Sequence, residues 1–276
     1  MQFEMLRAYA PSALVLAAVA DARDSIDELL RMPEVFRPGA AREAFEPLLF
    51  QSEMHSNAFL EGVEVPIAAM LDEMKADSPL GVRLRSIAAV QARIAADAKT
   101  FLQTPPRILA AWQVAASAGL PDADDSRGRP RVAGELLVDP LNSGIAASDV
   151  SDCTPTLIAL VTQNAVEIPP IVRAACVYLL LSLAMPFTHG NGVLARSAAH
   201  AVLIGQGTDP DHRLALMTAM TAAGRPRYVQ SLRAASALTD EAVDNWVVWF
   251  CQLIEQAALQ SRTIVEQVRE ALSAQL

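Results

Sequence analysis

One segment of the sequence constrains the fold more than any other: residues Ala174–Phe187 are almost continuously apolar. The segment is shorter than the ~20 residues that a membrane crossing needs. It also contains Pro186 and is followed by a polar turn built around Gly190-Asn191-Gly192. A helix without a polar face has to be covered by other elements on all sides. The sequence therefore predicts a helical domain with this helix at its centre.

The rest of the chain predicts an all-α fold. Hydrophobic residues make up 52% of the 276 positions, and most windows repeat them with helical periodicity. The helices expected on this basis span residues 12–31, 40–55, 67–76, 84–102, 105–118, 154–164, 169–184, 192–206, a stretch after 211, 228–236 and 240 to the C-terminus. Because no internal repeat or low-complexity linker interrupts them, we expect one domain over 1–276, with N-terminal helices in 1–80 and a core in 81–276.

One long segment departs from the helical pattern. Residues 119–152 are rich in Gly, Pro, Asp, Asn and Ser, and their only strand-like run is Glu135–Val138. An irregular segment of this length is uncommon in a compact domain and is usually functional. We expect a surface loop here, with a short β-hairpin flap as an option.

Charge and cysteine content limit the partners and the compartment. The formal net charge is −9, which disfavours nucleic acid and anionic membrane surfaces as partners. Three cysteines at wide spacings favour reduced thiols over disulfides or a zinc site. The apolar run 12–20 imitates a secretion signal, but Glu4 and Pro11 argue against export. We therefore expect a cytoplasmic protein without a membrane span. The sequence is compatible with either a monomer or a homodimer.

The chemistry is concentrated in the window from Met185 to Arg196. Glycines on both sides of Asn191 allow unusual backbone conformations, and the turn leads into a predicted helix. The unpaired N–H groups and the dipole at a helix N-terminus favour an anion. Arg196, one turn into that helix, adds a cation that can bind phosphate. The window therefore predicts an anion site, whereas a structural glycine turn beside a solvated arginine is the alternative.

The twelve residues from Met185 to Arg196 resemble, without a gap, the core motif of the Fic/Doc (Fido) family, H-x-F-x-[D/E]-G-N-G-R-x-x-R. Upstream, Glu61-Gly62 resembles the inhibitory-helix pattern of that family, with Asn57 at the position of its Ser or Thr. The segments from Tyr228 to Leu232 and from Trp246 to Phe250 resemble its closing helices. The resemblance covers nearly the whole chain and implies a Fic-type helical domain. Most members of the family are AMP transferases (adenylyltransferases) that use ATP with magnesium.

The resemblance also implies roles for single residues. Phe187 would pack the motif loop into the core, and Gly190, Asn191 and Gly192 would form the phosphate- or nucleotide-binding turn. Arg196 would hold the terminal phosphate of ATP or pair with the inhibitory Glu61. We therefore expect Glu61 at the end of a helix that faces the motif, within ~4 Å of Arg196.

Three departures from the motif fall on its reacting centre. Met185 replaces the catalytic histidine, and a thioether cannot act as a general base, which normally contributes about 10²–10⁴-fold in rate. His189 replaces the acidic ligand of magnesium, which prefers oxygen donors. Val193 replaces the first arginine. The binding of ATP with magnesium is thus expected to be weakened, and no metal site is predicted, since His200 lies too far along the helix to share an ion with His189.

Three functions remain open from the sequence. The first is a degenerate AMP-transferase site that binds a nucleotide or another phosphate ligand with weak or no transfer. The second is a transferase of altered chemistry that uses His189 as its base or takes another phosphate donor, such as a phosphocholine or phosphosugar compound. The third is a catalytically inactive interaction or regulatory module, closed by Glu61, that binds a protein partner.

Overall fold

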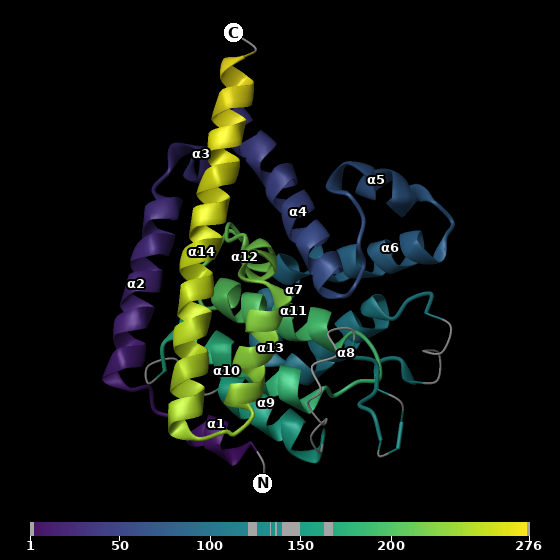
Figure 1. Ribbon diagram of the computed structural model, residues 1–276, viewed down its shortest axis with the longest axis vertical. Helices are drawn as coiled ribbons and strands as arrows, with labels where there is room; N and C mark the ends of the chain where they lie inside the picture. The colour runs from purple at the N-terminus through teal and green to yellow at the C-terminus, as the bar shows by residue number, and fades with distance from the viewer. Residues whose placement is uncertain are drawn as a thin grey trace.

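A computed structural model describes residues 3–120, 126–132, 134–135, 137–139, 150–162 and 168–274 of the protein. Fourteen α-helices and one short 3-10 helix account for most of these residues, and none of them forms a strand (Figure 1). The all-α class predicted from the sequence is therefore confirmed.

The helices follow one another through short connections in most of the described chain. Those before the long loop are α1 (Glu4–Ala8), α2 (Ala13–Leu30), α3 (Pro33–Phe36), α4 (Ala40–Leu60), α5 (Ile67–Lys75), α6 (Pro79–Gln91), α7 (Ile94–Gln103) and α8 (Pro105–Ala116). Those after it are η2 (Val150–Asp152), α9 (Cys153–Thr162), α10 (Pro170–Ala184), α11 (Asn191–Gly205), α12 (Leu216–Ala223), α13 (Arg225–Ala235) and α14 (Asp240–Ser273).

Helix α10 lies at the centre of the core, as its apolar sequence predicts. All of its residues are buried except Pro170 and Ser182, and α9, α11, α13 and α14 pack around it. Helix α11, the next along the chain, is also buried over almost its whole length. The Met185–Arg196 motif begins directly after α10 and ends inside α11, so two buried helices hold it in place.

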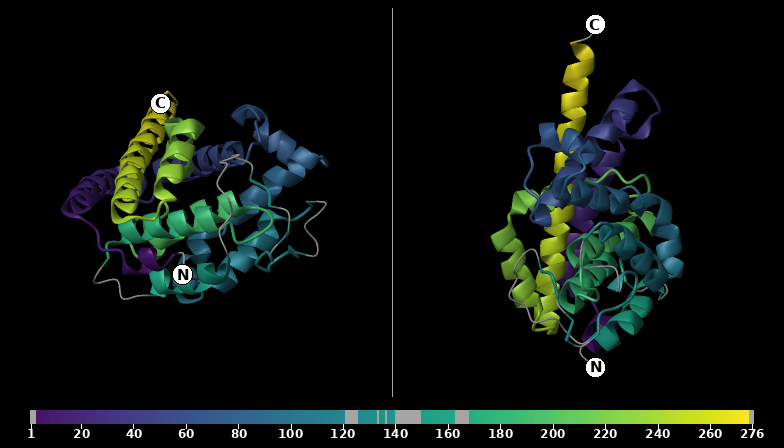
Figure 2. Two further views of the ribbon diagram at one scale, coloured as in Figure 1. Left: turned by 60° about the horizontal axis from the view of Figure 1, so that its bottom comes forward. Right: turned by 90° about the vertical axis from the view of Figure 1, so that its right-hand side faces the viewer.

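The long helix α14 forms the outer layer together with α2. The two helices lie side by side in Figures 1 and 2, and the C-terminal end of α14 projects beyond the rest of the molecule. Arg262 of α14 pairs with Glu28 of α2, and Arg269 donates to both carboxylate oxygens of Glu34 in α3. Helix α14 also contacts α4, α10, α12 and α13, so it connects the N-terminal helices to the core.

Two helix boundaries predicted from the sequence are wrong. The predicted helix 84–102 is divided into α6 and α7 by a turn at Ala92 and Arg93. The helix predicted to end at residue 55 continues to Leu60. Ser56 and Asn57 are polar, but both are buried and hydrogen-bonded to other elements, so the helix extends through them. This extension brings Glu61 to the motif.

The loop expected at 119–152 is only partly described. Its residues 121–125, 133, 136 and 140–149 lie outside the described part, so the proposed hairpin flap stays a prediction. In the described residues, the N–H groups of Arg131 and Val138 donate to the carbonyls of Pro186 and Thr188, at 2.8 Å and 3.0 Å. The loop is thus attached to the motif backbone. Within the described part of the chain, no helix has the length and apolar character needed to cross a membrane.

Candidate functional site

The motif forms a closed turn between α10 and α11. Met185 ends α10 in the left-handed conformation, and Gly190 caps α11 with a φ of 79°. A Cβ atom on Gly190 would also lie 3.0 Å from the Cβ of Ala116, so glycine fits this position for two reasons. Asn191 closes the turn, because its Nδ2 donates to the Phe187 carbonyl at 2.7 Å and its Oδ1 accepts from the Phe187 N–H at 3.0 Å. Phe187 itself is buried.

A buried ion pair joins the end of α4 to the second turn of α11. Glu61 follows the last residue of α4, and its Oε1 lies 2.7 Å from Arg196 Nη2. Both side chains are only 1% exposed. A Cβ atom on Gly192 would overlap Glu61 Oε1, so the carboxylate lies directly against the N-terminal turn of α11. The contact expected between Glu61 and Arg196 is present.

Two further residues complete the environment of this ion pair. Arg83 in α6 donates from Nη2 to Glu61 Oε2 at 2.8 Å and from Nη1 to the Ala116 carbonyl at 3.1 Å. Asn57 accepts from Arg196 Nε at 2.9 Å and donates to Gln91 Oε1 at 3.1 Å. Asn57 could be identified from the sequence, because it lies four residues before Glu61. Arg83 has no such signal, because only the packing of α4 on α6 brings it to the site.

The positions that depart from the family motif are well defined in the structure. Met185 is buried, and its carbonyl accepts from Arg131 Nε at 2.8 Å, while Arg131 Nη2 donates to the Ala184 carbonyl at 3.1 Å. Val193 is fully buried, and His189 is partly exposed on the turn. The guanidinium of Arg131 thus binds two carbonyls at the C-terminus of α10.

Two of the other histidines, His200 and His212, form a separate cluster at the other end of α11. His200 Nε2 lies 2.9 Å from Asp209 Oδ2, and the rings of His200 and His212 pack edge to face at 4.3 Å. Burial, together with the neighbouring His200, lowers the pKa of His212 to about 3. The spacing of these residues did not predict that they meet. The described residues contain no group of three or more His, Cys, Asp or Glu side chains arranged to hold a metal ion.

Comparison with solved structures identifies the fold. A Fic family protein from Desulfovibrio desulfuricans G20 matches 97% of this chain and 76% of its own, with a TM-score of 0.62 and 17% identity. The chain has the Fic fold. Fic-1 from C. elegans matches 96% of this chain and 74% of its own, with a TM-score of 0.62 and 17% identity. A Fic-domain-containing signaling protein from Bacteroides thetaiotaomicron VPI-5482 matches 91% of this chain and 98% of its own, with a TM-score of 0.61 and 12% identity.

Sequence comparison adds no closer relative. No protein-family model matches this chain, and no curated protein matches it either. Identities of 12–17% to the solved structures support a shared fold, but not a shared activity or ligand. The Fic-type helical fold implied by the motif is therefore confirmed, whereas its chemistry has to be argued from the residues of this chain.

Proposed function

We propose that this Fic-fold protein binds a nucleotide or another phosphate ligand at the N-terminus of α11 and transfers AMP weakly or not at all. One observation carries the proposal: the carboxylate of Glu61 is held between Arg196 and Arg83 and against Gly192. An oxyanion thus already occupies the position that the turn and the arginines favour.

The chemistry of this position suits a phosphate oxygen as well as a carboxylate. Arginine binds both groups through several N–H donors, and the dipole of α11 favours negative charge at its first turn. The side chain of Arg196 is 1% exposed, so it requires an anion at all times. A phosphate ligand would take over the contacts of Glu61 when that carboxylate moves away. Exchange of one buried anion for another leaves no uncompensated charge.

The same site supports little transfer chemistry. Met185 offers no base for the attacking hydroxyl, and the fully buried Val193 offers no second cation for the phosphates. Magnesium does not fit the residues present, because His189 supplies a nitrogen where the motif has a carboxylate and the ion prefers oxygen ligands. We therefore expect binding that does not depend on magnesium.

Titration calorimetry with ATP, with and without magnesium, tests this proposal. Glu61→Gln removes the competing charge at constant size, and ATP should bind this variant at least about tenfold more tightly than the native protein. Glu64→Gln is the matched control, because Glu64 is exposed three residues further along. Adding Arg196→Met to Glu61→Gln should abolish the binding. If ATP and pyrophosphate fail to bind Glu61→Gln while its fold is intact, the proposal is wrong.

A second candidate function is a closed interaction module. The observation that favours it is the attachment of the long loop to the motif, through the N–H groups of Arg131 and Val138 and the side chain of Arg131. In that case Glu61→Gln should gain no phosphate binding. A transfer assay with labelled ATP separates both candidates from altered chemistry at His189, which predicts transfer that His189→Asn abolishes.

A further inference from the structure

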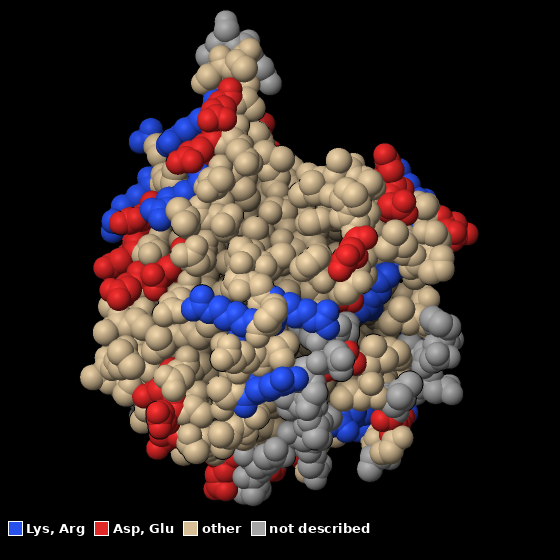
Figure 3. Space-filling model, in the orientation of Figure 1, with Lys and Arg blue, Asp and Glu red and all other residues tan. Residues whose placement is uncertain are grey.

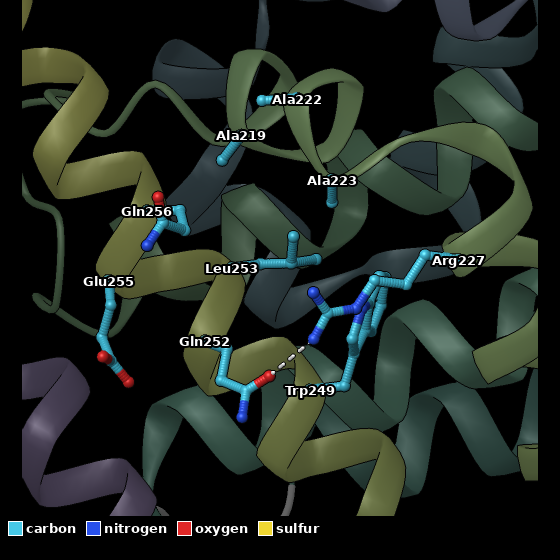
Figure 4. A pocket seen from close by; sticks show the side chains of 9 residues that line it. All are labelled: Ala219, Ala222, Ala223, Arg227, Trp249, Gln252, Leu253, Glu255 and Gln256. Atoms are coloured by element: carbon cyan, nitrogen blue, oxygen red, sulfur yellow. Dashed lines mark hydrogen bonds between the residues drawn. The ribbon is translucent and has the colours of Figure 1, made fainter.

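A concave site lies on the outer layer of the molecule, and none of the residues that line it belongs to the motif. Helices α12, α13 and α14 enclose a pocket of about 340 Å³ (Figure 4). Its apolar part comes from Leu253, Trp249 and three alanines of α12, of which Ala222 is exposed at the rim. The small side chains of α12 leave the space open. The volume is within the range of small-molecule sites in proteins, which is about 300–1,000 Å³.

One cation, Arg227, lies at the edge of this pocket. In Figure 4 the side chain of Arg227 extends past Trp249 to Gln252, and its Nη2 donates to Gln252 Oε1 at 3.3 Å. Within the described part of the chain, this amide is the hydrogen-bond partner of Arg227, and no carboxylate pairs with it. Its remaining N–H donors are therefore available to a ligand.

The charge around the pocket favours an anion, although the chain as a whole is acidic. Helix α13 carries Arg225, Arg227 and Arg233 and no acidic residue. Figure 3 shows Lys and Arg side chains gathered in a band across the middle of this face. Glu255 is the acidic residue among those lining the pocket, and Figure 4 shows its carboxylate directed away from Arg227. Burial and the nearby Asp21 raise the pKa of Glu255.

We propose that this pocket binds an organic carboxylate with a flat apolar body. The carboxylate would accept from the remaining N–H donors of Arg227, while the body would lie on Leu253 and Trp249. A cationic ligand of the same shape would be repelled by the positive charge of Arg227. A neutral one would lose the charge-assisted hydrogen bonds. The pocket shares no residue with the α11 turn, so a failure of this proposal would not affect the proposed function, and the reverse also holds.

Three naphthalene derivatives of matched shape test this site: 2-naphthoate, 2-naphthamide and 2-(aminomethyl)naphthalene. The readout is the indole N–H signal of Trp249 in the ¹⁵N-labelled full-length protein. Trp112 serves as the internal reference, because its N–H group bonds to Asp97 and it belongs to α8, which does not line the pocket. We expect a saturable shift with 2-naphthoate and at least about tenfold weaker binding of the amide and the amine.

Variants assign the binding to the pocket. Ala222→Trp should fill it and abolish the 2-naphthoate shift, whereas Ala234→Trp, at an exposed position of α13 outside the pocket, should not. Arg227→Gln should weaken 2-naphthoate at least about tenfold, and Arg233→Gln should leave it within about twofold. Equal affinity for the three compounds, binding that survives Ala222→Trp, or no saturable shift with 2-naphthoate would each overturn the proposal. Unchanged circular dichroism confirms that each variant is folded.

Discussion

The ion pair between Glu61 and Arg196 makes a quantitative prediction about stability. Glu61→Gln keeps the size of the side chain and removes its charge, so Arg196, whose side chain is 1% exposed, loses its anionic partner. Arg83 loses its carboxylate partner too, but its side chain is 18% exposed and water compensates part of its charge. The main cost therefore comes from the single, fully buried cation of Arg196.

The magnitude follows from the cost of an unpaired buried charge. Breaking a buried pair on one side destabilises a protein by about 3–5 kcal/mol. In a chain of this length, each kcal/mol corresponds to roughly 2 °C in Tm. We therefore expect Glu61→Gln to lower the free energy of unfolding by about 3–5 kcal/mol and the Tm by about 6–10 °C.

A double-mutant cycle separates the pair from its surroundings. Arg196→Met removes the cation and leaves a neutral side chain of similar length, and the double variant Glu61→Gln with Arg196→Met removes both charges. Because replacing a whole buried ion pair by neutral groups is often nearly neutral, the double variant should cost at least about 2 kcal/mol less than the sum of the two single changes. Glu64→Gln, at an exposed position, should stay within about 0.5 kcal/mol of the native protein.

The measurement is urea unfolding followed by circular dichroism, with calorimetric Tm values as a check. If Glu61→Gln costs less than about 1 kcal/mol, the carboxylate is not the required partner of Arg196. Strict additivity in the cycle would refute the reasoning as well, since it would mean that Glu61 and Arg196 stabilise the fold independently.

Two further predictions concern the turn and the histidine cluster. Gly192→Ala should lower the free energy of unfolding by about 1–3 kcal/mol, because the added Cβ overlaps Glu61 Oε1; an unchanged Tm would contradict the close approach of the carboxylate to α11. The pKa of His212 is about 3 in the fold and about 6.5 when unfolded, so the unfolded state alone takes up this proton as the pH falls from 6.5 towards 3, and stability declines over that window. Asparagine tolerates the φ of 56° at this position, so His212→Asn is a suitable variant. Measured by urea unfolding at pH 7 and pH 5, its free energy of unfolding should decline less steeply than that of the native protein, by up to about 1.4 kcal/mol per pH unit. Equal slopes in the two proteins would show that His212 does not titrate in this way.

Local pattern alone determined several features of this protein. The almost continuous apolar run at 174–184 specifies a buried central helix, because such a helix has no broad polar face for water to solvate. The glycines that flank Asn191 specify a turn at the start of α11, and the structure has one. The expected contact of Glu61 with Arg196 came from the likeness of two short motifs to known ones, and the fold brings these residues together.

The tertiary structure decided what local pattern could not. Helix α4 continues past residue 55 because Ser56 and Asn57 find partners on other elements, and α6 separates from α7 although Ala92 and Arg93 carry no helix-breaking signal. The sequence pattern also did not predict three other contacts. These are the ion pair of Arg83 with Glu61, the hydrogen bonds of the long loop to the motif, and the contact of His200 with His212. Local conformation depends on neighbours within a few residues, which the sequence states directly. A contact such as that of Arg83 with Glu61, or of Arg131 with Met185, depends on how whole helices pack, and only their combined burial fixes that arrangement.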